Sequence, residues 1–425
     1  MLLAVVMLGV PAPLLAQGGG LAQRVAGAPE GRVQFSFAAR PGVCGNGRSF
    51  IQTGPNSFSG SWSDNDGPQR EACVAGPVRV VLDRAAGNVL SVQTYVGPPA
   101  VAPGSTDLGT VRAQDAVDYL LDLARRAEGR AGRETLLPAM LADSANVTPA
   151  LVAIAKDQSL PRETRRGAMS WLGRATGDEA TIPAEVPDAL LQVARDESDN
   201  VEVRRAALGS IARLAHGAGI PPLMELARAN LTGDRTWLSK ESLSALARSG
   251  DPRAREFLRS VVQRSDVPDE VMTTAIRGLG GEYATPRDAE LLRGIYPKLT
   301  GDRSREAVLA SVADIGGAEN TRWLLSVARD ESTPSQLRRR ALSLAARAGV
   351  SSAELAKMYD ATSDQQLKES LVEILGQSGD RAATDKLMAI ARSEQDPRLR
   401  RRTIAQLSRS EDPRVKELLK ELIEK

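Results

Sequence analysis

The strongest constraint on the fold of this 425-residue chain is a motif that recurs through roughly its C-terminal three quarters. Residues 190–198 read LLQVARDES and residues 324–332 read LLSVARDES, and related stretches begin at Leu151 and Leu387. A sequence that repeats at a short period folds as a stack of similar units, because one unit alone cannot bury its apolar face. The repeat therefore argues against a single closed globule for this part of the chain.

The alanine of the motif serves as an anchor for the register of the repeats. Equivalent anchors recur about 33 residues apart at Ala124, Ala155, Ala194, Ala227, Val262, Tyr296, Ala328, Tyr359 and Ala391. Six residues after the last eight anchors come Pro161, Asn200, Gly233, Pro268, Asp302, Pro334, Gln365 and Pro397, and all except Gln365 favour turns. Apolar residues recur at helical spacing on both sides of these turns. We predict about nine hairpins of two amphipathic helices over residues 113–425, with one continuous hydrophobic core.

The turns carry a second, more specific pattern. Asp followed by Pro or Asn precedes a Val/Leu-Arg pair, as in Asp199-Asn200 with Val203-Arg204. With the Ala/Leu face of the second helix, this pattern resembles HEAT repeats, in particular the short bacterial HEAT-like type named after phycobilisome lyases. The resemblance covers about residues 113–425 and implies a mainly α fold, an α-α superhelix. The units around Val262, Tyr296 and Tyr359 depart from it, because they lack the arginine pair.

Acidic and basic residues recur at one spacing around these turns. Asp157, Asp196 and Asp330 each precede an arginine by eight residues, namely Arg165, Arg204 and Arg338. This spacing carries the carboxylate from the end of the first helix to the start of the second. We predict a structural ladder of Asp–Arg pairs, because the guanidinium fork can bond a carboxylate and a backbone carbonyl together. A stripe of arginines that binds an anionic ligand is the alternative interpretation.

The chain before residue 113 has a different character. Residues 30–96 hold four of the five phenylalanines, and the alternation of apolar and polar residues at 33–37 and 78–82 indicates β-strands. A turn at residues 85–88 leads into a further strand, which predicts a hairpin. We predict a small β-rich module at residues 30–96 and a Pro/Gly linker at residues 97–112.

Cys44 and Cys73, the only cysteines of the chain, both lie in this module. A disulfide would stabilise a domain with a thin core, and disulfides persist in oxidising compartments; two buried free thiols are the alternative. Residues 1–16 are apolar, uncharged and shorter than a membrane span. They predict a signal peptide cleaved near Ala16, a periplasmic or secreted location of bacterial type, and no membrane span after cleavage. A buried N-terminal segment is the alternative.

The composition leaves little material for a catalytic or metal site. The chain has one histidine, two cysteines and 3% aromatic residues, so we expect no metal, no cofactor and no catalytic residue. The repeat region carries 47 basic and 47 acidic residues. A nucleic-acid-binding surface normally shows a basic excess, so we expect no nucleic acid partner.

Three functions fit these features, and no motif marks partner-binding residues. We expect a non-catalytic exported scaffold that binds a protein or peptide on the solenoid surface, because solenoids expose large extended faces. The alternative is a sensor that binds a ligand or an envelope glycan through Phe50, Phe58 and Trp62 of the β-rich module. A third hypothesis is an enzyme with a site where the module meets the repeats.

Overall fold

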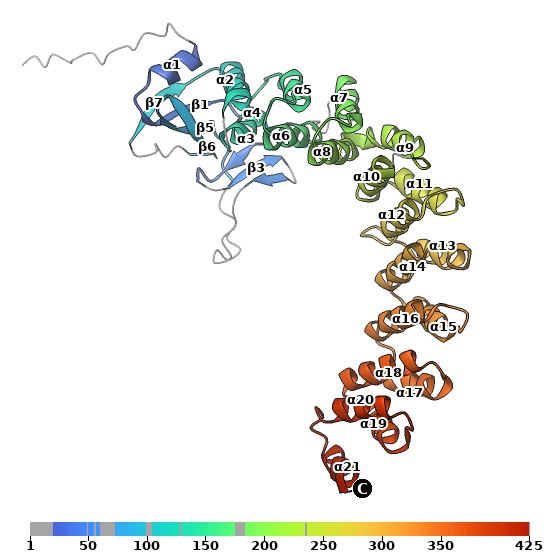
Figure 1. Cartoon of the computed structure of the whole chain (residues 1–425). Coiled ribbons are helices and arrows are strands. Elements are labelled where there is room, and N and C mark those ends of the chain that lie inside the picture. The colour runs from blue at the N-terminus through green and yellow to red at the C-terminus, as the bar shows by residue number, and fades with distance from the viewer. Residues whose placement is uncertain are drawn as a thin grey trace, which may run out of the picture. The chain divides into compact units, whose positions relative to one another are not determined.

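The computed structural model describes residues 20–48, 50–54, 57–59, 73–98, 104–127, 130–174, 183–233 and 236–424. A small β-rich part precedes a long series of helical hairpins, so the fold is mainly α, as predicted (Figure 1). The chain divides into two compact units, residues 1–219 and 220–425, and each is described by itself. The predicted signal peptide at residues 1–16 lies outside the described residues.

The first unit opens with a short helix and two small sheets. The bounds are α1 Leu21–Gly27, β1 Gly31–Phe37, β2 Cys44–Gly45, β3 Ile51–Gly54, β4 Ser57–Ser59, β5 Val78–Ala85, β6 Asn88–Val96 and β7 Ser105–Thr110. The main sheet has the strand order β6-β5-β1-β7, and the second sheet has the order β2-β3-β4. The hairpin expected around residues 85–88 is present as the antiparallel pair β5 and β6.

Strand β7 corrects the predicted linker at residues 97–112. It pairs in parallel with β1, with Arg32 opposite Ser105 and Val33 opposite Thr106, so residues 105–110 belong to the sheet. The segment reads STDLGT, and its side chains are exposed or half-buried because β7 is an edge strand. It carries no apolar alternation, which is the signal by which a strand is recognised in a sequence.

The main sheet and the first repeat helices share one hydrophobic core. Phe35 on β1 and Leu82 on β5 are fully buried. The ring of Phe35 meets that of Tyr119 edge-on, with a centroid distance of 6.1 Å, and Tyr119 belongs to α2 (Ala113–Arg126). The Glu134 carboxylate accepts a hydrogen bond of 3.0 Å from the backbone N–H of Val92 on the edge strand β6. The β-rich part is therefore packed onto the first helices within one compact unit.

The first unit continues through two complete hairpins and ends in a tight turn. The bounds are α3 Ala131–Glu134, α4 Leu136–Leu141, α5 Thr148–Lys156, α6 Arg162–Leu172, α7 Glu185–Arg195, α8 Val201–Ala212 and the 3-10 turn η1 Ala215–Gly217. In η1, His216 adopts a left-handed φ of 54°. Gly219 follows this turn, at a position that has no room for a side chain, because an added Cβ would lie 1.7 Å from the carbonyl oxygen of Ile211. The two compact units divide directly after this turn.

The second unit consists, in its described residues, of six hairpins and a final helix. The bounds are α9 Ile220–Arg228, α10 Thr236–Ala247, α11 Pro252–Val262, α12 Asp269–Leu279, α13 Pro286–Ile295, η2 Tyr296–Lys298, α14 Asp302–Ile315, α15 Ala318–Arg329, α16 Ser335–Arg347, α17 Ser352–Ala361, α18 Gln365–Ser378, α19 Arg381–Ser393, α20 Pro397–Leu407 and α21 Pro413–Glu424. The first helices of the hairpins form one layer and the second helices form the other (Figure 1).

The register of the repeats coincides with the ends of the helices. The nine anchors lie at or beside the C-terminal ends of first helices, and none is more than 8% exposed. Pro161, Asn200, Pro268 and Pro334 are the N-cap residues of second helices. Proline is tolerated at the start of a helix because the first N–H groups have no intrahelical acceptor.

Within each unit, neighbouring second helices pack more closely than neighbouring first helices. An added Cβ on Gly280, after α12, would lie 2.3 Å from the Cβ of Ser311 on α14. An added Cβ on Gly173, after α6, would lie 2.9 Å from the carbonyl oxygen of Ser210 on α8. Closer packing in one layer curves a stack toward that layer, so the second helices line the inner side of each unit.

Candidate interaction surface

The arginines of the predicted ladder connect successive repeats. Arg165 donates from Nε to the carbonyl oxygen of the anchor Ala155 at 3.1 Å, and from its two terminal nitrogens to Asp199 at 2.7 and 2.5 Å. Asp199 lies in the turn of the following repeat. Arg338 makes the same two contacts, with the Ala328 carbonyl at 3.1 Å and with Asp364 at 2.9 Å. Each guanidinium group therefore connects the end of the first helix of its own repeat to the turn of the next repeat.

The ion-pair partners thus differ from the predicted ones. The Oδ1 atoms of Asp157, Asp196 and Asp330 accept hydrogen bonds from the backbone N–H at 3.0 Å, and from the hydroxyl at 2.6 to 2.7 Å, of the serine two residues later. These serine hydrogen bonds lower the pKa of all three carboxyl groups. The three aspartates therefore close local turns, and Arg204 bonds the Ala194 carbonyl at 3.1 Å.

Burial supports a structural role for the ladder. The side chains of Arg165 and Asp199 are 4% and 3% exposed, and those of Arg338 and Asp364 are 7% and 20% exposed. Both guanidinium groups are already neutralised by a carboxylate. This favours the structural interpretation of Arg165 and Arg338 over the anion-binding stripe.

The second unit contains a cluster of charged side chains around a buried aspartate that was not predicted from the sequence. Asp288 on α13 has a fully buried side chain, and it bonds Arg255 and Arg259 of α11 at 2.8 Å each. The backbone N–H of Thr285 also donates to it at 2.8 Å. The three residues come from two neighbouring first helices, so no short-range spacing in the sequence reveals the cluster.

The inner surface of the second unit, formed by the exposed side chains of α10, α12, α14, α16, α18 and α20, is rich in both charges. Ion pairs cross between neighbouring second helices at three places: Lys240–Glu270 at 2.6 Å, Arg340–Glu306 at 3.5 Å, and Arg402 with Glu369 and Glu373 at 2.9 and 3.2 Å. The surface therefore alternates in sign from α14 to α20 and extends over successive repeats.

The second helices also share a pattern that was not recognised in the sequence. In five of them an exposed arginine is the last residue of the helix or follows that residue by one or two positions: Arg174, Arg213, Arg248, Arg347 and Arg409. We call these five residues the end arginines. A basic residue precedes each of them by eight positions: Arg166, Arg205, Lys240, Arg339 and Arg401. The spacing is visible in the sequence, but its meaning depends on knowing where each second helix ends.

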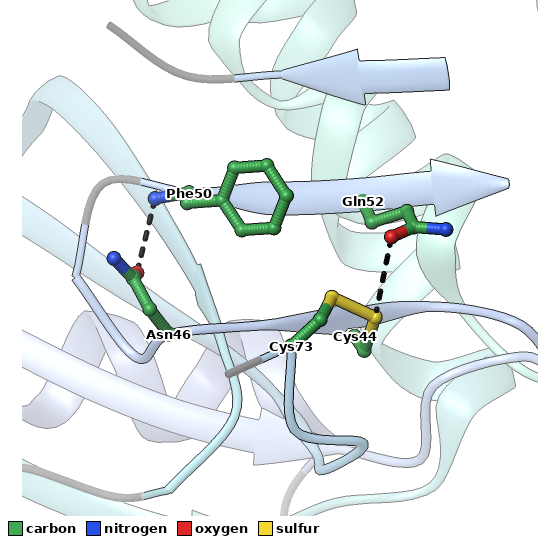
Figure 2. Close-up of a disulfide and its surroundings, with 5 residues drawn as sticks. All are labelled: Cys44, Asn46, Phe50, Gln52 and Cys73. Atoms are coloured by element: carbon green, nitrogen blue, oxygen red, sulfur yellow. Dashed lines mark hydrogen bonds between the residues drawn. A yellow bond between two sulfur atoms is a disulfide. The ribbon is translucent and has the colours of Figure 1, made fainter. Parts of the chain in front are cut away.

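The disulfide in the β-rich part is present, with a Cα–Cα distance of 5.2 Å between Cys44 and Cys73 (Figure 2). Gln52 on β3 lies beside it, and the backbone N–H of Phe50 donates to Asn46 Oδ1 at 3.0 Å (Figure 2). The pairing is typical of an oxidising, non-cytoplasmic compartment. Of the three aromatic residues proposed to bind a ligand, Phe50 is half-buried, whereas the Phe58 side chain and Trp62 lie outside the described residues.

The described residues offer little else that could form a ligand or metal site. A hollow of about 540 Å³ on α7, lined by Asp188, Leu191, Gln192, Arg195 and Asp196, is widely open to solvent. No three His, Cys, Asp or Glu side chains in this part of the chain are grouped as metal ligands would be. None of its helices has both the length and the apolar character that crossing a membrane requires.

A series of stacked helical hairpins follows a small disulfide-bonded β-rich part in the chain, and this architecture defines the protein as a helical-repeat scaffold. Residues 187–279 and 352–425 match the family model of HEAT repeats, which confirms the prediction of HEAT-like repeats for these two stretches. No curated protein has a significantly similar sequence.

Several solved structures are similar to parts of this chain. They include human deoxyhypusine hydroxylase in complex with glycerol (18% identity, 61% of this chain and 94% of that chain, TM-score 0.25). Lipovitellin has 12% identity over 80% of this chain and 41% of that chain, with a TM-score of 0.44. The complex of CpcE and CpcF of phycocyanin lyase from a Nostoc species has 16% identity over 65% and 94%, with a TM-score of 0.27. At these values the structures carry no functional information about this chain.

Proposed function

We propose that this protein is an exported, non-catalytic scaffold that binds a protein or peptide on the inner surface of its repeats. The observation that carries the proposal is the extended inner surface of the second unit, where charged side chains of both signs follow one another from α10 to α20. Such a surface can contact a partner over several repeats, which is the usual way in which solenoids bind. The disulfide supports export, because such bonds persist outside the reducing cytosol.

Site-specific photo-cross-linking in the native cell tests the surface. A photoreactive residue replaces Ser244 on α10 or Ser343 on α16, which are partly exposed on the inner surface. Matched controls replace Arg322 on α15 or Lys357 on α17, which are exposed on first helices. We expect one discrete protein adduct from the inner positions and none from the controls, with the partner identified by mass spectrometry. Adducts from the controls alone, or from no position, would contradict the proposal.

Deletion of the β-rich part is not a suitable test of where the partner binds. The ring of Phe35 packs against Tyr119 of α2, so removing the sheet would expose the first repeat helices. Export is tested separately by the mass of the mature protein recovered from the cell envelope. We expect a chain that begins at Gln17, and recovery of a chain that retains Met1 would contradict signal cleavage.

A further inference from the structure

Two second helices of the second unit carry basic charge alone. Residues 335–347, which form α16, contain four arginines and no acidic residue, and residues 397–407, which form α20, have the same composition. The intervening helix α18 contains two glutamates and one lysine. The charge balance of the whole chain therefore hides a local excess of positive charge on these two helices.

Some of these arginines are neutralised and others are not. Arg338 pairs with Asp364, Arg340 with Glu306, and Arg402 with Glu369 and Glu373. Six others are exposed and have no carboxylate within ion-pair distance among the described residues. Arg398 and Arg400 lie in the first turn of α20, whereas Arg339, Arg347, Arg401 and Arg409 occupy matching positions in or directly after α16 and α20. These two repeats thus present four guanidinium groups at matching positions without a carboxylate partner among the described residues.

The helix dipole explains only half of this set. A cation at the C-terminal end of a helix gains about 0.3–1 kcal/mol from the dipole, which accounts for the end arginines Arg347 and Arg409. Arg339 and Arg401 are the fifth residues of α16 and α20, where the dipole favours no cation. Arg166, Arg205 and Lys240, at the same position of other repeats, each pair with a glutamate. Arg339 and Arg401 have no such partner among the described residues, so their charge requires another explanation.

Helix geometry gives the spacing of these groups. A separation of eight residues is about 12 Å along a helix. Two steps between packed helices, from α16 across α18 to α20, amount to about 20 Å. An extended peptide of about six residues spans that distance. Such a peptide would cross α18, whose two glutamates, Glu369 and Glu373, both form ion pairs with Arg402. These ion pairs reduce the repulsion between the glutamates and an acidic peptide.

We infer that these four arginines recognise an acidic, extended segment of a protein partner, an inference that rests on the proposed scaffold function. Guanidinium groups bind carboxylates with paired hydrogen bonds, so glutamate or aspartate side chains are the matching chemistry. A nucleic acid fits less well. Its phosphates carry one charge per about 1.7 Å of duplex, and such a uniform charge, continued beyond α16, would meet exposed Asp314 on the neighbouring helix α14.

Fluorescence anisotropy with the purified full-length chain tests the inference. The probes are a labelled polyglutamate peptide, a polyglutamine peptide of equal length and a single-stranded oligonucleotide of equal net charge. The variant Arg347→Glu/Arg409→Glu removes the end arginines of α16 and α20, and Arg322→Glu/Lys357→Glu makes the same change in net charge on first helices. A third variant, Arg347→Lys/Arg409→Lys, keeps the charge. Circular dichroism verifies that each variant is folded.

We expect salt-sensitive binding of polyglutamate, weakened about tenfold or more by the Arg347→Glu/Arg409→Glu variant and little by the Arg322→Glu/Lys357→Glu variant. The lysine variant, which keeps the charge but loses the paired hydrogen bonds, should weaken binding less than the Arg347→Glu/Arg409→Glu variant does. No saturable binding to the unmodified protein would overturn the inference, and so would an equal loss in the first-helix variant. Tighter binding of the oligonucleotide through the same arginines would replace it with a nucleic acid surface. If inner-surface cross-links to a partner persist in the Arg347→Glu/Arg409→Glu variant, the inference fails and the scaffold function stands. If the protein with all its arginines gives no cross-links at the inner surface, the scaffold function itself is refuted.

Discussion

Single arginines hold neighbouring repeats together in this protein. Arg165 is the best-defined example, because one side chain bonds the carbonyl of its own first helix and the carboxylate of the next turn. A buried carboxylate that lost this partner would keep its desolvation cost and gain nothing in return. The contribution of such a residue is therefore seen most clearly when one partner is removed.

We predict that Arg165→Met lowers the free energy of unfolding by about 3–5 kcal/mol, because it leaves Asp199 buried and unpaired. The control is Asp196→Asn, a half-buried aspartate of the same turn region that can keep its hydrogen bonds as asparagine, and this change should cost less than about 1 kcal/mol. Urea unfolding followed by circular dichroism measures both. Equal effects of the two variants would show that the buried pair is not special.

The Asp288 cluster predicts a pH dependence of stability in the second unit. Burial by itself would raise the pKa of Asp288, but hydrogen bonds from Arg259, Thr285 and Arg255 outweigh it and hold the pKa below its usual value. A carboxyl group whose pKa is lower in the folded state stabilises the fold above its unfolded pKa of about 3.9. This stabilisation is lost as the pH falls below that value toward the folded pKa.

Asp288→Asn should therefore flatten the loss of stability below about pH 4, and lower stability at neutral pH because half-buried Arg255 loses its carboxylate partner and Arg259 keeps only Glu256. Asp314→Asn, on the exposed end of α14, is the control and should retain the steep acid dependence. Urea unfolding over a series of pH values compares the variants. An unchanged acid dependence in Asp288→Asn would contradict the assignment.

The sequence could predict which residues form the ladder but not how they pair. The spacing of Asp157 and Arg165 suggested a partner within one repeat, and the guanidinium fork was expected to bond a carboxylate and a carbonyl. The second expectation is correct for Arg165 and Arg338. The first is not, because a serine two residues after each aspartate captures the carboxylate locally. Local hydrogen bonds of Asp and Ser compete effectively with longer contacts.

At the scale of elements, hairpin positions follow from the sequence because turn residues recur at a fixed distance from the buried anchors. Strand β7 could not be recognised in the same way, since an exposed edge strand needs no apolar alternation. The inner surface was likewise hidden, because the end arginines acquire a common position only once the helix ends are known. Packing between second helices depends on small residues such as Gly280, whose role is also invisible without the neighbouring helix.

Gly280→Ala should destabilise the second unit by about 1–3 kcal/mol, because its Cβ would overlap Ser311 and force α12 and α14 apart. The matched control is Gly294→Ala on α13, where an added Cβ meets nothing within 4 Å. That change should leave stability equal or raise it by up to about 1 kcal/mol, because alanine favours the helix. Thermal unfolding measures both, and a neutral Gly280→Ala would show that close packing of second helices is dispensable.

At the scale of the whole molecule, the two compact units divide at Gly219 rather than at the linker expected near residue 100. The shift has a physical cause, since Phe35 and Tyr119 join the sheet to the first repeat helices. One covalent constraint, the Cys44–Cys73 disulfide, lies in the first unit. Residues 220–425 contain no cysteine, so no disulfide constrains the second unit.

Removal of the disulfide should therefore affect the two units differently. Its cysteines are 29 residues apart, and closing a loop of that size stabilises the folded state by about 3.5 kcal/mol in the chain-entropy model. In Cys44→Ser/Cys73→Ser, we expect amide hydrogen exchange to accelerate in β1, β5 and the other described strands, while residues 220–425 keep their protection. Gln52→Ala, beside the disulfide, controls for local disturbance. Equal acceleration in both units would mean that they unfold as one cooperative body, and no acceleration in the sheet would mean that the disulfide adds little to the stability of the first unit.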